Sequence, residues 1–542
     1  YADIMAEQLD EMQKHADKGK NDPNYDQVTA QAVIDEMNTR HEKLMSPDSH
    51  PLSSTLTSLG FIYFLGLSVA SGAVNLLQTA LVAYPQMGAK WGFDNAFKEL
   101  SLAAGQSLHG LNDISKSLQG DEAVRRGVID VTQAHDLAGI AQGEDSGVMW
   151  KLRPIMRWAS FIFHQAERFN REVTFVASYR LAKQAGAKHD QAFEQAMKAT
   201  YDGHFDYSSG NRPRIMQGNV AKVVLLFKQF GQNMLYTMLR SLHQSFKGET
   251  PQARKEAVRA LTGIMASHAV FAGTMGLPLI STLLGLVSFL GGSDDEPWDA
   301  ETALKNGLAD SIGVTATDVL MNGVSRLTPW DISGRVSINN LIVPKTREGL
   351  EGESQAQAVM TAALGPIGGI FVNILKGFKE ISDGHGMRGV ETMSPTFMRG
   401  PLRAMRFAEE GAQDKTGVSI QDDVSIAAIL GQAAGFAPSE VRLATEGRSA
   451  VYDLQKKLDA RRTSLMTRYA RAKMDEDQDG MDEAWEEIQA FNQANPERKI
   501  NKIQAMQSYR KRQKRINDAE HGMVVSRKKR DDLDEGRFAY RD

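Results

Sequence analysis

Residues 57–84, TSLGFIYFLGLSVASGAVNLLQTALVAY, form the centre of a stretch at residues 51–89 that contains no charged side chain. Gly, Ala and Ser alternate with Leu, Ile, Val and Phe along it. About 20 apolar residues are enough to cross the hydrocarbon core of a bilayer as a helix. The stretch is therefore long enough to span a membrane, and its small residues would let helices pack closely there.

Two further stretches, residues 260–293 and 354–375, also lack Asp, Glu, Lys and Arg, although 24% of the whole chain is charged. Their Gly, Ser and Thr content, like Asn75 and Gln78 in the first stretch, reduces the free energy gained by insertion. Two interpretations stay open: helices that enter a membrane only under some conditions, and helices buried permanently in a protein core. Under the first, the membrane-segment candidates are Phe61, Leu65, Leu76, Leu81, Leu279, Leu284, Phe289 and Ile370.

The totals limit the classes of protein that the chain can belong to. Its 542 residues are enough for two to four domains, and its net charge of −4 argues against a uniformly basic nucleic-acid binder. The absence of cysteine excludes disulfides, thiolate metal sites and a cysteine nucleophile. Because the first residue is Tyr1, we expect the chain to be part of a longer polypeptide.

The hydrophobic spacing predicts an all-α fold, an extended assembly of several helical subdomains with no significant sheet. One helix is expected at about 220–246, where Lys222, Lys228 and Arg240 argue against a membrane span and for a buried bundle helix. The predicted segments are an amphipathic helical part at 1–50, the uncharged segment at 51–89, a helical bundle at 90–255, a second hydrophobic segment at 256–295, an irregular connector at 296–353, a third hydrophobic segment at 354–411, a charged helical domain at 412–520 and a tail at 521–542.

No catalytic site is expected in these residues. The P-loop pattern GxxxxGK[ST], the metalloprotease pattern HExxH and the hydrolase pattern GxSxG do not occur. His204 and Asp206 share a polar stretch, where a histidine is more often a hydrogen-bonding group than a catalytic base. We therefore predict a non-enzymatic chain that needs no cofactor, with a catalytic domain possible upstream.

A calcium-loop pattern occurs at Asp475-x-Asp477-x-Asp479-Gly480-x5-Glu486. Calcium prefers carboxylates at alternate loop positions, a glycine at the sharp turn and a bidentate glutamate at the twelfth position. Asp482 stands where such loops usually carry an aliphatic residue. The alternative is a solvated acidic turn between two antiparallel helices, with Gly480 closing the first of them.

The C-terminal region is strongly basic, with twelve Lys and Arg at residues 498–530 against Asp518 and Glu520. Such a density can neutralise phosphates of DNA or of anionic lipid headgroups. It can also form a solvated helix face, or pair with the acidic residues at 475–487. The candidates for DNA or lipid contact are Arg510, Lys511, Arg512, Lys514, Arg515, Lys528 and Arg530.

The sequence PLRAMRFAEEG at residues 401–411 resembles the signature region of the PLxRFG domain, which is found near the C-termini of very large bacteriophage virion proteins. Three residues separate Leu402 from Arg406, and Ala408 stands where the family name has Gly. The stretches GFAP at 435–438, ERFNR at 167–171 and EIQAFNQANP at 487–496 are similar to the same family.

This resemblance implies an internal virion protein of a short-tailed phage. Such proteins form a homo-oligomeric ring in the capsid core, on the portal and beside other core proteins and the phage DNA. During infection they are expelled into the periplasm and inner membrane of the host, where they help to form a channel for the genome. Two alternatives remain: a soluble core scaffold without membrane insertion, and the nucleic-acid-binding tail of a virion transglycosylase or RNA polymerase encoded upstream.

Overall fold

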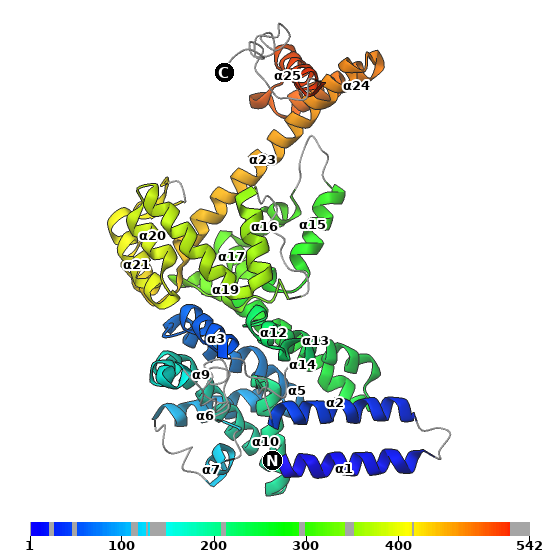
Figure 1. The fold of residues 1–542 in the computed structure, drawn as a ribbon, viewed down its shortest axis with the longest axis vertical. Coiled ribbons are helices and arrows are strands. Elements are labelled where there is room, and N and C mark those ends of the chain that lie inside the picture. Colours follow the sequence, from blue (N-terminus) through cyan, green and yellow to red (C-terminus); the bar gives the residue numbers. More distant parts are fainter. Residues whose placement is uncertain are drawn as a thin grey trace, which may run out of the picture. The chain divides into compact units, whose positions relative to one another are not determined.

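The computed structural model describes residues 2–20, 26–45, 51–109, 118–125, 128–129, 148–207, 213–291, 299–341, 352–414 and 417–520. These residues are helical almost throughout, which confirms the all-α prediction (Figure 1). The four strands among these described residues are only two or three residues long and pair antiparallel as β1 with β4 and β2 with β3. The strands are β1 (Trp330–Asp331), β2 (Ala412–Gln413), β3 (Ser419–Gln421) and β4 (Ala437–Pro438).

The chain folds into two compact units, unit 1 with Tyr1–Ile280 and Ile312–Arg442, and unit 2 with Ser281–Ser311 and Leu443–Asp542. The helices of the first part of unit 1 are α1 (Ala2–Gly19), α2 (Gln27–Met45), α3 (Pro51–Phe64), α4 (Val69–Leu76), the π-helix η1 (Thr79–Ala83), α5 (Tyr84–Trp91), α6 (Phe93–His109), α7 (Leu118–Arg125), α9 (Val148–Gln184), α10 (His189–His204), α11 (Arg214–Gln217), α12 (Asn219–Val224), α13 (Lys228–Lys247), α14 (Pro251–Ala272) and the 3-10 helix η3 (Thr274–Gly276).

The second part of unit 1 is also mostly helical. It contains α17 (Val314–Asn322), η4 (Val324–Leu327), α18 (Ser333–Val336), α19 (Gly352–Ser382), α20 (Gly386–Met393), α21 (Thr396–Glu410) and α22 (Ile426–Ala433). The third hydrophobic segment is broken, because Gly365 interrupts α19 with φ 61° just before Pro366.

Unit 2 is built mainly from α24 (Gln478–Ala494), η5 (Pro496–Arg498) and α25 (Lys502–Glu520). Three helices have residues in both units: α15 (Ile280–Gly291), α16 (Ala300–Ile312) and α23 (Ser439–Met474). Leu465, Ile488, Phe491 and Ile500 form the buried core of this unit.

The boundary between the units falls inside α23, not near residue 411. Residues 412–442 belong to unit 1, because β4 pairs with β1 and the Ser439 N–H donates to the Pro329 carbonyl at 2.9 Å. The Arg442 guanidinium also lies 2.6 Å from the buried carboxylate of Asp331. These long-range contacts cannot be predicted from the local composition, which changes earlier in the chain than the boundary between the units.

The expectation of an irregular connector at 296–353 is wrong for its described part. Residues 299–341 form α16, α17, η4, β1 and α18. The glycines that suggested irregular structure end these short helices instead: Gly313 and Gly323, with φ 85° and 96°, flank α17. Glycine adopts this left-handed conformation at little steric cost.

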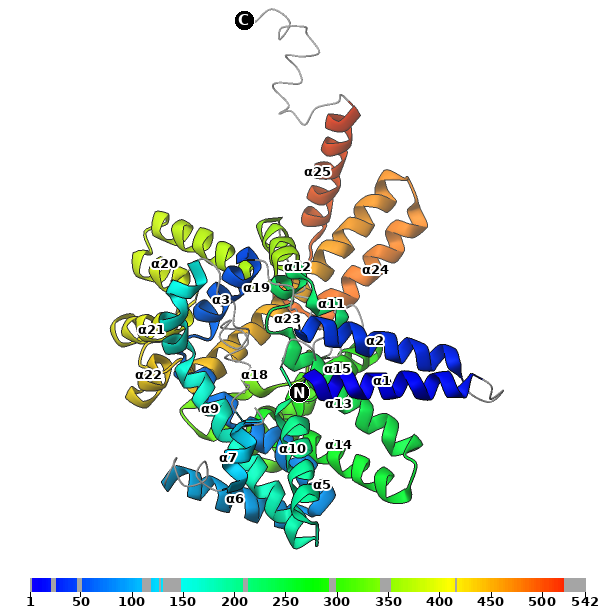
Figure 2. The ribbon, with the colours of Figure 1, turned by 60° about the horizontal axis from the view of Figure 1, so that its bottom comes forward.

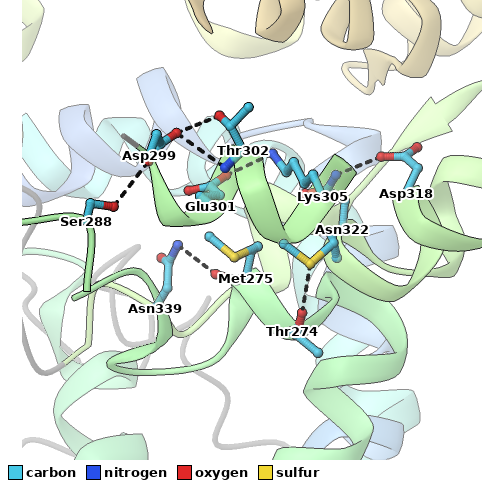
Figure 3. A network of polar contacts seen from close by, with 11 residues as sticks. Thr274, Met275, Ser288, Asp299, Glu301, Thr302, Lys305, Asp318, Asn322 and Asn339 are labelled. Carbon is cyan, nitrogen blue, oxygen red and sulfur yellow. Dashed lines mark hydrogen bonds and ion pairs between the residues drawn. The ribbon is translucent and has the colours of Figure 1, made fainter. Parts of the chain in front are cut away.

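Polar side chains fix these short helices, as Figure 3 shows. In unit 2, the Asp299 carboxylate accepts from Thr302 at the start of α16, and the Ala300 N–H donates to Ser288 Oγ at 2.8 Å. In unit 1, Asn339 Nδ2 donates to the Met275 carbonyl at 3.2 Å. These contacts satisfy helix ends and loops, which explains their polarity without a ligand.

Candidate functional site

The uncharged segment folds into four short helical pieces, not one span. Leu67, with φ 53°, separates α3 from α4, and its N–H donates to the Ala159 carbonyl at 2.9 Å. Ser68 then caps α4 through its hydroxyl. Among the described residues no single helix is long and apolar enough to cross a membrane, and only Thr55–Phe64 with Val69–Trp91 reaches that length together, across a bend of 88°.

The side chains of this segment belong to two different hydrophobic clusters. Phe61 is fully buried with Met156 and Leu226. Leu81 is buried with Val82, Met234 and Ile264, which connects η1 to the helices α13 and α14. In the conformation described here, the centre of the segment is therefore core.

The other membrane-segment candidates are divided between buried and exposed positions. Ile370 is buried beside Tyr63 on α3. Leu65 and Leu284 are half-buried, whereas Leu76 and Leu279 are 43% and 41% exposed. The side chain of Phe289 lies outside the described residues. The second hydrophobic segment is itself split, because the first part of unit 1 ends at Ile280 and unit 2 begins at Ser281.

Small residues allow the close approaches around the segment. A Cβ at Gly203 on α10 would lie 2.7 Å from Ala83 Cβ and 3.0 Å from Ala83 Cα. A Cβ at Gly72 would lie 2.7 Å from Ile162 on α9. Gly72, a small residue of the uncharged segment, is thus used here to pack helices within the protein.

Tyr63 is the polar hub that attaches α3 to the later part of unit 1. Its hydroxyl donates to the Met393 carbonyl at 3.2 Å and accepts from Arg399 Nη2 at 3.0 Å. Asn373 Nδ2 on α19 donates to the same oxygen at 3.4 Å. One hydroxyl thus connects residues more than 300 positions apart, and no local sequence pattern signals this contact.

The PLxRFG-like stretch lies in α21 beside a buried carboxylate. Glu391 on α20 is 2% exposed and forms ion pairs with Arg403 and with Arg406, the latter at 3.0 Å. Arg406 is itself buried, so removal of the carboxylate would leave a desolvated cation. The two arginines of this stretch therefore have a packing role in the fold.

A second buried polar network surrounds α9. Arg171 donates to the carbonyls of Val128 at 3.2 Å and Phe205 at 2.6 Å. His204 Nε2 lies 2.7 Å from Thr174 Oγ1. Burial, and then the nearby Arg171 guanidinium, lower the pKa of His204 from 6.5 to about 3. A neutral, fully enclosed imidazole acts here as a hydrogen-bonding group, as the sequence suggested for this residue.

The acidic turn is shorter than a calcium loop. Helix α23 ends at Met474 and α24 begins at Gln478, so Asp479 and Glu486 lie on a helix and Asp475 and Asp477 in the turn. Asp477 Oδ1 accepts from the Gly480 N–H at 3.0 Å as the N-cap of α24. Gly480 thus lies in the first turn of the second helix, and its expected role in closing the first is wrong. No group of three or more acidic or histidine side chains within the described ranges is placed to hold a metal ion.

The basic candidates that the structure describes lie on α25. Arg510, Lys511 and Lys514 are exposed, whereas Arg512 Nη2 donates to Thr467 Oγ1 on α23 at 2.7 Å. Lys473 of α23 lies over the ring of Tyr509. Lys528, Arg530 and the side chain of Arg515 lie outside the described residues.

Compared with family models, with curated proteins and with solved structures, the chain matches none. Its function has to be inferred from its own residues.

Proposed function

We propose that the chain is a structural, non-enzymatic component of the internal core of a short-tailed bacteriophage. In this proposal it is expelled into the host and helps to form a conduit for the genome across the cell envelope. Copies of the chain pack as a ring in the virion beside the portal and other core proteins. The uncharged segments then leave their packed positions and enter the inner membrane.

The observation that carries the proposal is the double character of residues 51–91. The segment has the length and composition of a span only if its two halves join across the 88° bend. In the packed form Phe61 and Val82 are fully buried, and the polar hub at Tyr63 attaches α3 to the rest of unit 1. Release of the few polar contacts and straightening at Leu67 would produce an uncharged helix longer than the about 20 residues that a bilayer requires.

The resemblance of residues 401–411 to the PLxRFG domain supports the phage setting. Arg406 of this stretch forms an ion pair with Glu391 on α20. Glu391 lies two residues before Met393, whose carbonyl accepts a hydrogen bond from the Tyr63 hydroxyl. The family-like stretch and the uncharged segment therefore meet in one polar region of unit 1. A soluble core scaffold would use the same contacts permanently, so the two functions differ in whether residues 51–91 ever leave them.

Insertion can be tested with a single cysteine, because the natural chain has none. Leu76→Cys, at a partly exposed site, would carry an environment-sensitive fluorophore, with Leu430→Cys on α22 as the control. The full chain is partly unfolded in urea and diluted into vesicles. We expect a blue-shifted emission, quenched from within the bilayer, for Leu76→Cys alone. An aqueous spectrum at both positions under every refolding condition would exclude insertion and leave the soluble scaffold or the nucleic-acid-binding tail.

Exposed Arg510 and Lys511 on α25 support an accompanying contact with phosphates of the phage DNA. Arg510→Glu with Lys511→Glu should weaken binding to duplex DNA and reduce its salt dependence by about 2 in the log–log slope, since each lost phosphate contact removes about one unit. An unchanged slope would remove α25 from the proposal.

A further inference from the structure

The hairpin of α13 and α14 leaves an apolar face uncovered where a buried helix was expected. The prediction of one helix at 220–246 is wrong, because Phe227, with φ 68°, separates α12 from α13. The inner face of α13 is core, with Met234 and Met238 packed near Ile264 of α14. The opposite face is open, with Phe246, Tyr236, Leu239 and Leu242 exposed by 73%, 63%, 53% and 45%.

These four side chains form a continuous stripe. Their spacing of three, three and four residues places them on one side of the helix, from its middle to its C-terminal end. Single exposed apolar residues are ordinary, whereas a contiguous row of large ones marks an interaction surface. Figures 1 and 2 show α13 and α14 side by side as a helical hairpin.

The charged residues around the stripe indicate an anionic partner. Helix α13 contains no Asp or Glu, and its Lys and Arg are Lys228, Arg240 and Lys247. The turn and first half of α14 add Arg254, Lys255 and Arg259 against Glu249 and Glu256. Glu256 accepts from Gln252 at 2.8 Å, and Arg240 lies 3.9 Å from Asp202 on α10. The end of the hairpin is therefore basic on balance.

We propose that the α13–α14 hairpin docks on an anionic lipid surface. Phe246, Leu239 and Leu242 enter the boundary between headgroups and acyl chains, Tyr236 lies at headgroup level, and Lys247, Lys255 and their basic neighbours contact lipid phosphates. An apolar stripe bordered by lysine and arginine is the pattern of a helix that lies in a membrane interface. Duplex DNA would use the same charges but would gain nothing from a row of Leu and Phe.

This docking goes beyond the insertion proposed above and stands without it, since it uses the folded protein and a different surface. The full chain is floated with vesicles of phosphatidylcholine, alone or mixed with anionic phosphatidylglycerol. We expect binding to the mixed vesicles that falls as salt is added, because exposed charges are screened. Equal binding to both kinds of vesicle would overturn the proposal.

Two paired variants test the two halves of the surface. Lys247→Gln with Lys255→Gln should weaken binding about 30-fold, from about 1 kcal/mol for each basic residue at an anionic surface. Lys183→Gln with Lys188→Gln, also exposed, is the matched control and should change little. Leu239→Ser with Phe246→Ser should weaken binding more than about tenfold, and Ile426→Ser with Leu430→Ser on α22 is its control.

Circular dichroism would confirm that each variant keeps its helices. Variants that bind vesicles as their controls do would overturn the proposal. If Lys247→Gln with Lys255→Gln then weakened binding to duplex DNA alone, the basic end of the hairpin would be assigned to DNA. Salt-reversible docking without a membrane signal at Leu76 would overturn the insertion alone. A membrane signal at Leu76 without hairpin-dependent docking would overturn the docking alone.

Discussion

Helix α3 and helix α13 are buried and exposed in the opposite way from what their charged residues suggest. The stretch with α3 carries no charge and looks like a membrane span, yet Phe61 is fully buried within the protein. Helix α13 carries Lys228, Arg240 and Lys247 and looks like a bundle helix, yet it exposes a row of apolar side chains. The number of charged residues in a helix is therefore a poor guide to whether one of its faces is buried. What matters is on which side of the helix the charged and the apolar residues lie.

A matched pair of phenylalanines gives the largest expected contrast. Phe61→Ala removes a fully buried ring beside Met156 and Leu226 and should lower the free energy of unfolding by about 3–5 kcal/mol. Phe246→Ala removes a ring that is 73% exposed and should change it by less than about 0.5 kcal/mol. Urea denaturation followed by circular dichroism measures both. Similar losses at the two positions would break the comparison.

A buried charge should matter far more than an exposed one. Glu391→Gln leaves buried Arg406 without its anionic partner and should cost about 3 kcal/mol of unfolding free energy. Glu409→Gln on the same helix pair removes an exposed carboxylate and should stay within about 0.5 kcal/mol. If the denaturation midpoints of the two variants coincide, the ion pair does not stabilise α20 against α21.

Glycine packing around the uncharged segment should show an effect of about 1–3 kcal/mol. Gly203→Ala brings a methyl group to 2.7 Å from Ala83 Cβ, so backbone has to move, and the stability should fall. Gly105→Ala on α6 meets no atom within 4 Å and should raise the stability by up to about 1 kcal/mol through helix propensity. Thermal unfolding distinguishes the two signs, and a stabilised Gly203→Ala would contradict the close contact.

The helical class and several helix ends could be predicted because they depend on local patterns. Gly365 interrupts α19 beside Pro366, and α23 begins directly after Pro438, at positions where glycine and proline favour a break. The connector at 296–353 was misjudged because Gly313 and Gly323 can interrupt a fold or end short helices, and only tertiary contacts distinguish the two.

The candidate site was harder to predict for the same reason. The apolar character of Phe61 and Leu81 was evident, but not whether lipid or protein covers them. The hydrogen bonds of Tyr63 depend on partners at 373, 393 and 399, which are far away in the sequence. Whether a face of α13 is exposed depends on whether another helix of the fold packs against it. Spacing identifies a face and leaves its partner open.

The smallest predicted effect concerns the histidine beneath the uncharged segment. In the unfolded chain His204 binds a proton below about pH 6.5, whereas in the folded chain burial and Arg171 keep it neutral down to about pH 3. Between these two pH values the unfolded state binds more protons than the folded state. The contribution of His204 to the free energy of unfolding is therefore complete above pH 6.5 and is lost as the pH falls toward 3. Between pH 7 and about pH 5.5 the loss should be about 1 kcal/mol.

His204→Gln should remove this part of the pH dependence, whereas His189→Gln at an exposed site should retain it. Denaturant titrations of the three proteins at both pH values measure the difference, and parallel losses in all three would show that His204 titrates normally and that the core beneath η1 admits water.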